Sequence, residues 1–295
     1  MTETKGKTVL VTGGAGFVGS HLCERLIKEG YSVISLDNYF TGTPENHIEG
    51  VVYREGHTKD VALIVSEKID LIYHLGEYSR IAPSLNEPEV VWDMNIVGTL
   101  AMLEFWRLQE CRLIYAGSST KFTEDNRTAD VAGKDRAPYN FSKAVNSELV
   151  HNYGRWYDLD YSIAYFYNVY GPRERAGQFS GGYGTVVETF RQCALQNKPC
   201  TINGDGSQTR AFTHVHDTVA ALLCIAETGE KDEYAISAKE VYSLNELADL
   251  FGLEKNYAPA TKSTRSTGAE DTAKLQALGW KQEYTLSEYV KACTK

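Results

Sequence analysis

The chain has 295 residues, of which 42% are hydrophobic and 23% are charged, and its formal net charge is -9. This length and composition are typical of one large globular domain, or of one such domain with a smaller lobe attached. The acidic balance disfavours a surface for nucleic acid or for anionic membranes, so neither is an expected partner.

Six cysteines are spread along the chain without CxxC pairs. This spacing disfavours a zinc site or a disulfide framework and favours a reducing compartment. The N-terminal segment lacks the apolar core of a secretion signal, and no run approaches the ~18 apolar residues of a membrane span. We therefore expect a cytoplasmic protein without a metal site.

Short β-branched runs alternate with longer helical patterns from residue 8 to about residue 168, which predicts a doubly wound parallel sheet, an α/β fold of the Rossmann type. The predicted strands are 8–13, 32–37, 51–56, 70–76, 112–118 and 161–169. The predicted helices are 17–29, 88–109, 139–157, 184–197 and 243–252, the last with a capping box at Ser243. We expect residues 1–170 to form the dinucleotide-binding domain, with a strand and a helix returning from about 205–235, and residues 171–295 to form a smaller substrate-binding lobe.

A glycine-rich stretch, GGAGFVG, follows the first predicted strand. Gly13 permits a tight turn, Gly16 lets the backbone approach a pyrophosphate, and Gly19 allows close packing of helix on strand. Phe17 and Val18 begin the next helix, whose first amides would face the anion. Such a turn alone is a weak signal, but its place at the head of a run of βαβ units favours a dinucleotide site.

The second predicted strand ends in LDN. Asp37 therefore lies where a carboxylate accepts hydrogen bonds from an adenosine ribose and repels a 2'-phosphate, which favours NAD over NADP. A turn or capping role for this aspartate is the alternative. Asn38 and Leu75, at the ends of the second and fourth strands, complete the expected cofactor contacts.

The stretch APYNFSK places Tyr139 and Lys143 on one face of a helix. A free phenol has a pKa of about 10 and is a poor base at neutral pH. An ammonium and an oxidised nicotinamide nearby both favour the phenolate, so Tyr139 is a candidate acid and base, and Lys143 would also hold the nicotinamide ribose. YxxxK arises often by chance, but Ser118 ends the preceding strand at the edge where such sheets gather ligands.

Together, TGGAGFVGSH, Asp37, Ser118 and the pair Tyr139 and Lys143 resemble the extended short-chain dehydrogenase/reductase family, in particular its NAD-dependent nucleotide-sugar epimerases and dehydratases. The segments NVYGPR (168–173), GDGSQTRAFTHVHD (204–217) and LGW (278–280) follow in the order which that family shows.

The resemblance implies a reaction and a substrate. Tyr139 would remove the proton from a sugar hydroxyl, usually at C4, as hydride passes to NAD, and Ser118 would hydrogen-bond the same oxygen. Lys143 would favour the phenolate. Asn168 and Arg210 would contact the diphosphate of a nucleotide-sugar substrate.

The residues after Ser118 bear on which reaction the chain catalyses. In the 4,6-dehydratases that it resembles, an Asp-Glu pair follows the catalytic hydroxyl, and UDP-glucuronate decarboxylases place a glutamate at the second of these positions. Here Ser119 and Thr120 stand there, predicted to contact substrate without acting as carboxylates, which disfavours dehydration and decarboxylation. We expect a 4-epimerase that works through a transient 4-keto sugar.

Two alternatives to epimerisation stay open. One is a C4 dehydrogenase with net oxidation, for example of a GDP-heptose in surface-polysaccharide synthesis. The other is a protein that binds NAD without catalysis, which the retention of Tyr139 and Lys143 disfavours.

The fourth predicted strand runs into HLGEYSR where the family commonly has HLAA. Glu77, Tyr78 and Arg80 therefore enter the region near the nicotinamide and the sugar. Tyr78 and Arg80 are predicted substrate contacts, and a role for all three in lining a loop is the alternative. His214 and His216 flank a strand-like HVH that, without nearby cysteines or paired acids, does not predict a metal site.

The helices predicted at about 88–109 and 139–157 carry apolar residues all round, more than one face of a sheet can cover. We expect a homodimer through these two helices, with well-buried helices of a monomer as the alternative.

Overall fold

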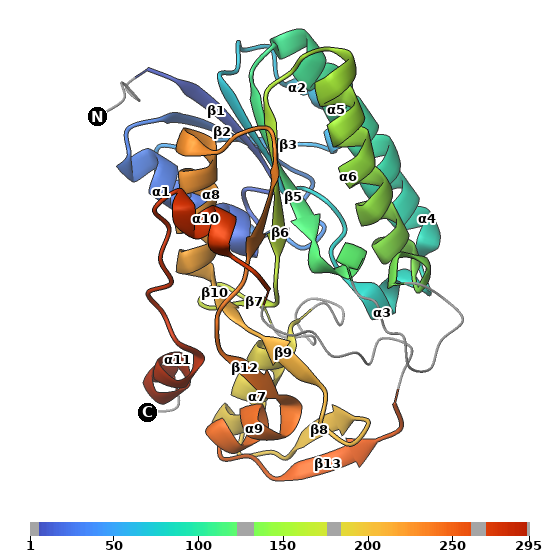
Figure 1. The fold of residues 1–295 in the computed structure, drawn as a ribbon, viewed down its shortest axis with the longest axis vertical. Helices are drawn as coiled ribbons and strands as arrows, with labels where there is room; N and C mark the ends of the chain where they lie inside the picture. The colour runs from blue at the N-terminus through green and yellow to red at the C-terminus, as the bar shows by residue number, and fades with distance from the viewer. Residues whose placement is uncertain (1–5, 123–132, 176–183, 261–269, 294–295) are drawn as a thin grey trace.

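The computed structural model describes residues 6–122, 133–175, 184–260 and 270–293. Its centre is a parallel sheet of seven strands in the order β11-β6-β5-β4-β1-β2-β3 (Figure 1). The strands are β1 (Thr8–Thr12), β2 (Ser32–Asp37), β3 (Val52–Glu55), β4 (Leu71–His74), β5 (Arg112–Ser118), β6 (Tyr161–Phe166) and β11 (Glu233–Ile236). The order reverses between β1 and β4, where doubly wound sheets open a crevice for ligands. The predicted Rossmann-type fold is confirmed.

Helices cover both faces of the sheet (Figure 1). α1 (Phe17–Lys28) and α8 (Val215–Thr228) pack on one face, and α5 (Gly98–Gln109) and α6 (Pro138–Trp156) pack on the other. The central strand shows why both faces need cover. Val9 and Val11 belong to the core on the α1 side, whereas Leu10 belongs to the core on the α5 side. Because side chains alternate along a strand, this run of apolar residues feeds both cores.

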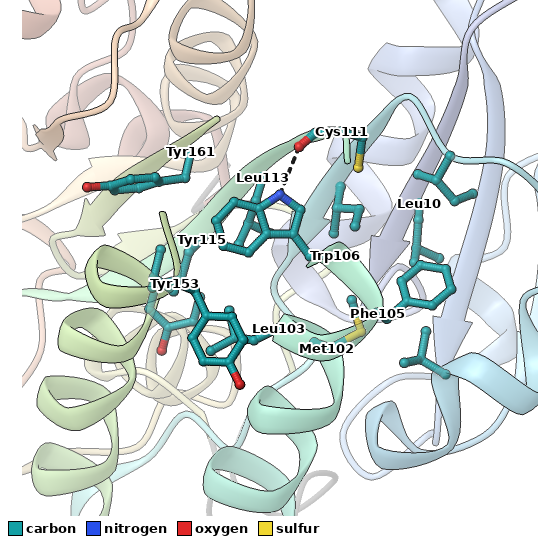
Figure 2. Packing of buried hydrophobic residues seen from close by; sticks show 14 of the residues in the cluster. Leu10, Met102, Leu103, Phe105, Trp106, Cys111, Leu113, Tyr115, Tyr153 and Tyr161 are labelled. Carbon is teal, nitrogen blue, oxygen red and sulfur yellow. Dashed lines mark hydrogen bonds between the residues drawn. The ribbon is translucent and has the colours of Figure 1, made fainter. Parts of the chain in front are cut away.

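Trp106 anchors α5 to the sheet, as Figure 2 shows. The indole is fully buried among residues of α5 and β5, including Leu103 and Leu113, and its Nε1 donates to the Cys111 carbonyl oxygen at 2.8 Å. Truncating a buried aromatic residue to alanine costs about 3–5 kcal/mol, so this contact is a major part of the stability of the α5 layer.

Two predicted strands end at least two residues earlier in the structure than expected. β4 ends at His74 rather than at residue 76, because the next two backbone amides turn to donate to the side chain of Thr12. β6 ends at Phe166 rather than at residue 169, because Asn168 adopts a φ of +40° that interrupts the strand. The chain then resumes as β7 (Val169–Tyr170), which pairs with β10 (Thr213–His214).

The helix predicted over 88–109 is continuous, but its middle segment is π-helical instead of α-helical. It consists of α4 (Pro88–Val91), a π-helical segment η3 (Trp92–Val97) and α5. Only the first residue of the strand-like HVH segment lies in a strand, because β10 ends at His214 and α8 begins at Val215, with the His214 ring accepting from the backbone of His216.

A smaller lobe gathers beyond β6, below the sheet in Figure 1. Its elements are α7 (Val186–Leu195), β8 (Cys200–Asn203), β9 (Thr209–Ala211), β12 (Val241–Ser243), α9 (Leu244–Leu250), β13 (Lys255–Ala258) and α11 (Leu286–Cys293). They share a separate apolar core around Phe190 and Leu247. The predicted capping box is confirmed: the Ser243 hydroxyl accepts from the Glu246 amide at 3.1 Å, and the Glu246 carboxylate accepts from the Ser243 amide at 2.7 Å.

The remaining elements are short. They are η1 (Pro44–Asn46), η2 (Thr58–Asp60), α2 (Val61–Ile64), α3 (Ile81–Ser84), η4 (Ser119–Phe122), η5 (Gly133–Asp135) and α10 (Ala273–Ala277). Within the described ranges, no helix has the length and apolar character needed to cross a membrane. α8 and β11 follow residue 170 in the chain but return to the large sheet. The domain boundary near residue 170 therefore stays a prediction.

Candidate active site

The glycine-rich turn between β1 and α1 leaves no room for side chains. Gly13 has a φ of +74°, and a Cβ there would lie 3.0 Å from the Cα of Gly76. A Cβ at Gly19 would lie 2.0 Å from the Gly13 carbonyl oxygen, so the helix packs directly on the turn. Gly16 is the N-cap of α1 and offers no side chain to its first amides, which belong to Phe17, Val18 and Gly19. This cradle fits the pyrophosphate of a dinucleotide.

Thr12 ties the ends of β1 and β4 together. Its hydroxyl oxygen accepts from the amides of Leu75 at 3.1 Å and Gly76 at 2.9 Å, and lies 2.7 Å from His74 Nδ1. The sequence did not reveal this role, because the pairing of β1 with β4 follows only from the sheet order. The hydrogen bond from its amide to Thr12 holds Leu75, a predicted cofactor contact, at the crevice between β1 and β4.

Asp37 is buried at the end of β2, and both of its oxygens accept backbone amides. Oδ2 accepts from Ala15 at 2.9 Å and Oδ1 from Tyr39 at 2.8 Å. Burial raises the pKa of Asp37, although these amides oppose the effect. Asn38 is exposed, and its side-chain oxygen accepts from the Phe40 amide at 3.1 Å. Each Asp37 oxygen keeps a second lone pair, so the turn role and a ribose contact are compatible.

Ser118 and Tyr139 meet at the carboxyl end of the sheet. The phenol of Tyr139 donates to the Ser118 hydroxyl oxygen at 3.1 Å, and the Thr120 hydroxyl donates to the same oxygen at 3.0 Å. Tyr139 is 8% exposed and Ser118 is 6% exposed, so both hydroxyl groups lie in a position that is largely closed to water. Ser119, a predicted substrate contact, is buried beside them.

Lys143 lies one turn after Tyr139 on α6, but its ammonium is turned toward the sheet. It forms an ion pair with the Glu77 carboxylate, donates to the Ala116 carbonyl oxygen at 2.5 Å and lies 3.4 Å from the Tyr115 hydroxyl. A hydrogen bond between the Lys143 ammonium and the phenol of Tyr139 is not among the contacts of the described residues.

Tyr78 and Arg80, predicted to contact substrate, occupy different surroundings. Tyr78 is 1% exposed, packs in a small apolar cluster with Tyr139, and donates from its hydroxyl to Glu87 at 2.6 Å. Arg80 is half-buried and donates to the Ser79 carbonyl oxygen at 3.1 Å. Their contact with a substrate stays a prediction.

Asn168 and Arg210 lie where the large sheet meets the smaller lobe. Asn168 donates from Nδ2 to the carbonyl oxygen of Ala211, on β9, at 2.8 Å. Arg210 is on the same strand, burial lowers its pKa, and its Nε has no hydrogen-bond partner among the described residues. A half-buried guanidinium whose buried Nε has an unused donor fits a bound anion such as a diphosphate.

Two buried asparagines near the site were not predicted from the sequence. Asn95, in the π-helical segment, accepts from the Tyr78 amide at 2.7 Å and donates to the Ser142 hydroxyl at 2.9 Å. Asn146 donates to Glu77 at 2.7 Å. Their only sequence signal was polarity inside otherwise apolar helices, and π-helical segments of this kind often occur at functional sites.

The fold and the site define an NAD-dependent enzyme of the Rossmann class. The chain belongs to the NAD dependent epimerase/dehydratase family, whose sequence profile matches residues 9–237. The members that it resembles act on nucleotide sugars as epimerases, decarboxylases and dehydratases.

Two relatives illustrate the range of the family. A putative UDP-glucose 4-epimerase of Methanocaldococcus jannaschii is 31% identical over 96% of each chain. UDP-glucuronic acid decarboxylase 2 of Arabidopsis thaliana is 30% identical over 97% of this chain and 67% of its own length.

Two solved structures of UDP-glucose 4-epimerases superpose on nearly the whole chain. UDP-glucose 4-epimerase of Thermotoga maritima, solved with UDP-glucose, superposes with a TM-score of 0.87 at 28% identity, covering 97% of each chain. UDP-glucose 4-epimerase of Thermus thermophilus, solved with NAD, superposes with a TM-score of 0.85 at 25% identity, again covering 97% of each chain.

Proposed function

We propose that this protein is a nucleotide-sugar 4-epimerase that oxidises its substrate to a 4-keto sugar and reduces the ketone on the opposite face. The observation that carries the proposal is the 3.1 Å contact between Tyr139 and Ser118 at the carboxyl end of the sheet. A sugar alcohol beside both oxygens would give its proton to the phenolate form of Tyr139 and accept a hydrogen bond from Ser118.

NAD, held by the glycine cradle and Asp37, supplies a reversible hydride acceptor. The chain's own residues bring the alcohol to it and manage the proton. Tyr139 is oriented by the packing of its ring beside Tyr78 and by the Ser84 hydroxyl, which lies 3.4 Å from the Tyr139 amide. Ser118 is oriented by Thr120, whose hydroxyl donates to it. A proton taken by Tyr139 in the oxidation is therefore held at the atom that returns it in the reduction.

Dehydration and decarboxylation find less support. Both reactions in this family are expected to use a carboxylate next to the catalytic hydroxyl, whereas Ser119 and Thr120 follow Ser118. Within the described ranges, no carboxylate is hydrogen-bonded to Ser118 or Tyr139. The nearby Glu77 carboxylate accepts from four other side chains. Because these contacts occupy its carboxylate, Glu77 favours neither dehydration nor decarboxylation.

The substrate side of the proposal is a nucleoside diphosphate sugar. The half-buried guanidinium of Arg210, whose Nε has no hydrogen-bond partner among the described residues, would neutralise the diphosphate, which the acidic chain as a whole repels. Asn168, hydrogen-bonded across to β9, would lie beside it.

The test is a panel of UDP-, GDP-, dTDP- and CDP-sugars, including UDP-glucuronate, incubated with the purified protein and NAD. Products are followed by NMR and by absorbance of the reduced cofactor. A new C4 stereoisomer without lasting reduced cofactor supports the proposal. Accumulating reduced cofactor with a ketosugar would instead assign a C4 dehydrogenase, and release of carbon dioxide would assign a decarboxylase.

We also propose that a second copy of this chain covers α5 and α6, which run side by side on one face (Figure 1). Large apolar side chains are exposed along these helices and the η3 segment that continues into α5: Trp92, Val97, Leu100, Leu108, Phe141 and Trp156. Trp156 is 63% exposed and Trp92 is in edge-to-face contact with Phe141, so the patch crosses both helices. A surface of this kind on two parallel rods is suited to packing against its own copy.

A further inference from the structure

Glu77 is a buried carboxylate in the loop after β4, where four side chains donate to it. Thr99 donates at 2.8 Å, Tyr115 at 3.1 Å and Asn146 at 2.7 Å, and the Lys143 ammonium forms the fourth contact. The side chain of Glu77 is 2% exposed. Three elements of the fold, α5, β5 and α6, therefore converge on one anion.

Lys143 is buried just as deeply, with a side chain that is 6% exposed. Besides Glu77, it contacts the Ala116 carbonyl oxygen at 2.5 Å and lies 4.8 Å from the centre of the Tyr115 ring. These neutral groups solvate the ammonium but carry no compensating charge. An isolated buried ammonium is unfavourable by several kcal/mol and tends to lose its proton.

The other titratable groups around the pair are uncharged. Burial lowers the pKa of His74, on β4, to about 4. Burial and the Glu77 charge raise the pKa of Tyr115, on β5, well above its usual value. Burial is the largest single effect on the pKa of Glu77 and would raise it, but the Lys143 charge and the hydrogen bonds that the carboxylate accepts together outweigh burial and hold that pKa below its ordinary value. Among the described residues, Glu77 is thus the counter-charge of Lys143.

We propose that Glu77 is a positioning residue that serves as the counter-charge of Lys143 and fixes its ammonium at the carboxyl end of β5. The inference rests on the proposed function to the extent that Lys143 serves the reaction. With Glu77 present, a cation stays one helical turn from Tyr139 while that phenol gives up and regains its proton. Without Glu77, the Lys143 ammonium is buried with no counter-charge among the described residues, and the phenolate form of Tyr139 loses a fixed cation one helical turn away.

The first test reads the protonation of Lys143 without any substrate. The full chain is labelled with ¹³C and ¹⁵N at lysine, and the Lys143 signal is assigned by its absence in Lys143→Arg. The midpoint of deprotonation is then measured in the wild type and in Glu89→Gln, an exposed change of the same chemistry on α4, and we expect the same midpoint in both. In Glu77→Gln, the midpoint of deprotonation should lie at least about one pH unit lower. An unchanged midpoint would overturn the proposal.

A second measurement covers the case in which Glu77→Gln is poorly folded. Urea unfolding is compared for Glu77→Gln, Lys143→Met and the double variant. If the unpaired ammonium is the cause of instability, the double variant should unfold at a higher urea concentration than Glu77→Gln. A double variant that is no more stable, or that also fails to fold, would show that Glu77 acts through its other bonds and not through Lys143.

Turnover supplies the third readout once an active sugar is known. For Glu77→Gln, the alkaline fall of kcat/KM should begin at lower pH than in the wild type, whereas a purely structural role would lower activity equally at every pH. Because the lysine titration needs no sugar, failure of the proposed function leaves that result intact, and an unchanged titration leaves the sugar panel intact.

Discussion

The phenolic oxygen of Tyr139 lies 3.1 Å from the hydroxyl oxygen of Ser118, and it donates to that oxygen. The two residues come from the first turn of α6 and the last residue of β5. An alcohol that enters between them would replace one hydrogen bond with two, one to each side chain. This contact supports the assignment of proton transfer to Tyr139 and of oxygen orientation to Ser118.

Ser118→Ala should lower kcat about a hundredfold, because the developing charge on the substrate oxygen loses one fixed donor. NAD affinity should change little, since the glycine cradle is not altered. Steady-state kinetics with the active nucleotide sugar measure the effect. Thr120→Val is the matched comparison: it removes the hydroxyl that donates to Ser118 and should lower kcat by less. A larger loss in Thr120→Val would assign the donor role to Thr120.

Asp37→Asn should raise the Kd for NAD at least about tenfold, because a charged hydrogen bond to the ribose contributes roughly 1.5–3 kcal/mol. The same change should lower the ratio of the Kd for NADP to the Kd for NAD, because an uncharged side chain does not repel a 2'-phosphate. Calorimetric titration of both cofactors gives the ratio. Equal losses for NAD and NADP would mean that Asp37 acts only by holding the amides of Ala15 and Tyr39.

Burial lowers the pKa of His74 to about 4 in the folded protein. An unfolded histidine has a pKa of about 6.5, so between these values the unfolded chain binds the extra proton. His74 should therefore remove stability as pH falls from about 6.5 to about 4, by up to ~3 kcal/mol. Urea unfolding across this range should show a steeper loss in the wild type than in His74→Gln. Parallel curves would contradict the assignment.

Leu100→Glu should convert a dimer to a monomer, because it places a charge in the exposed apolar patch of α5, where Leu100 is 44% exposed. Sedimentation equilibrium of the wild type and the variant measures this directly. Leu195→Glu, a change of the same kind at a 53% exposed residue of α7, is the control and should leave the mass unchanged. A monomeric wild type would refute the dimer.

The sequence predicted the main features of the nucleotide end and the sheet, because each depends on local patterning. Glycines after a strand require a turn whichever way the rest of the chain folds, and Gly13 adopts the expected positive φ. Ser118 and Tyr139 could be brought together because a strand end and the following helix share one edge of a parallel sheet.

The sequence did not predict the partner of Lys143. Glu77 is 66 residues from Lys143, and its direction depends on how β4 ends, which in turn depends on bonds from Leu75 and Gly76 to Thr12. The HLGEYSR segment suggested that Glu77 lies near the nicotinamide and the sugar or lines a loop, whereas the structure turns Glu77 inward to the lysine. Contacts set by several elements at once leave no periodic signal in the chain.

The most direct test of the account is Tyr139→Phe, which removes only the phenolic oxygen. With the nucleotide sugar identified by the panel, kcat/KM should fall by about 10³-fold or more, whereas the Kd for NAD should change by less than about threefold. Tyr157→Phe, at an exposed position just beyond α6, should behave as the wild type. Turnover by Tyr139→Phe at the wild-type rate would contradict the central claim that this phenol carries the proton of the sugar alcohol.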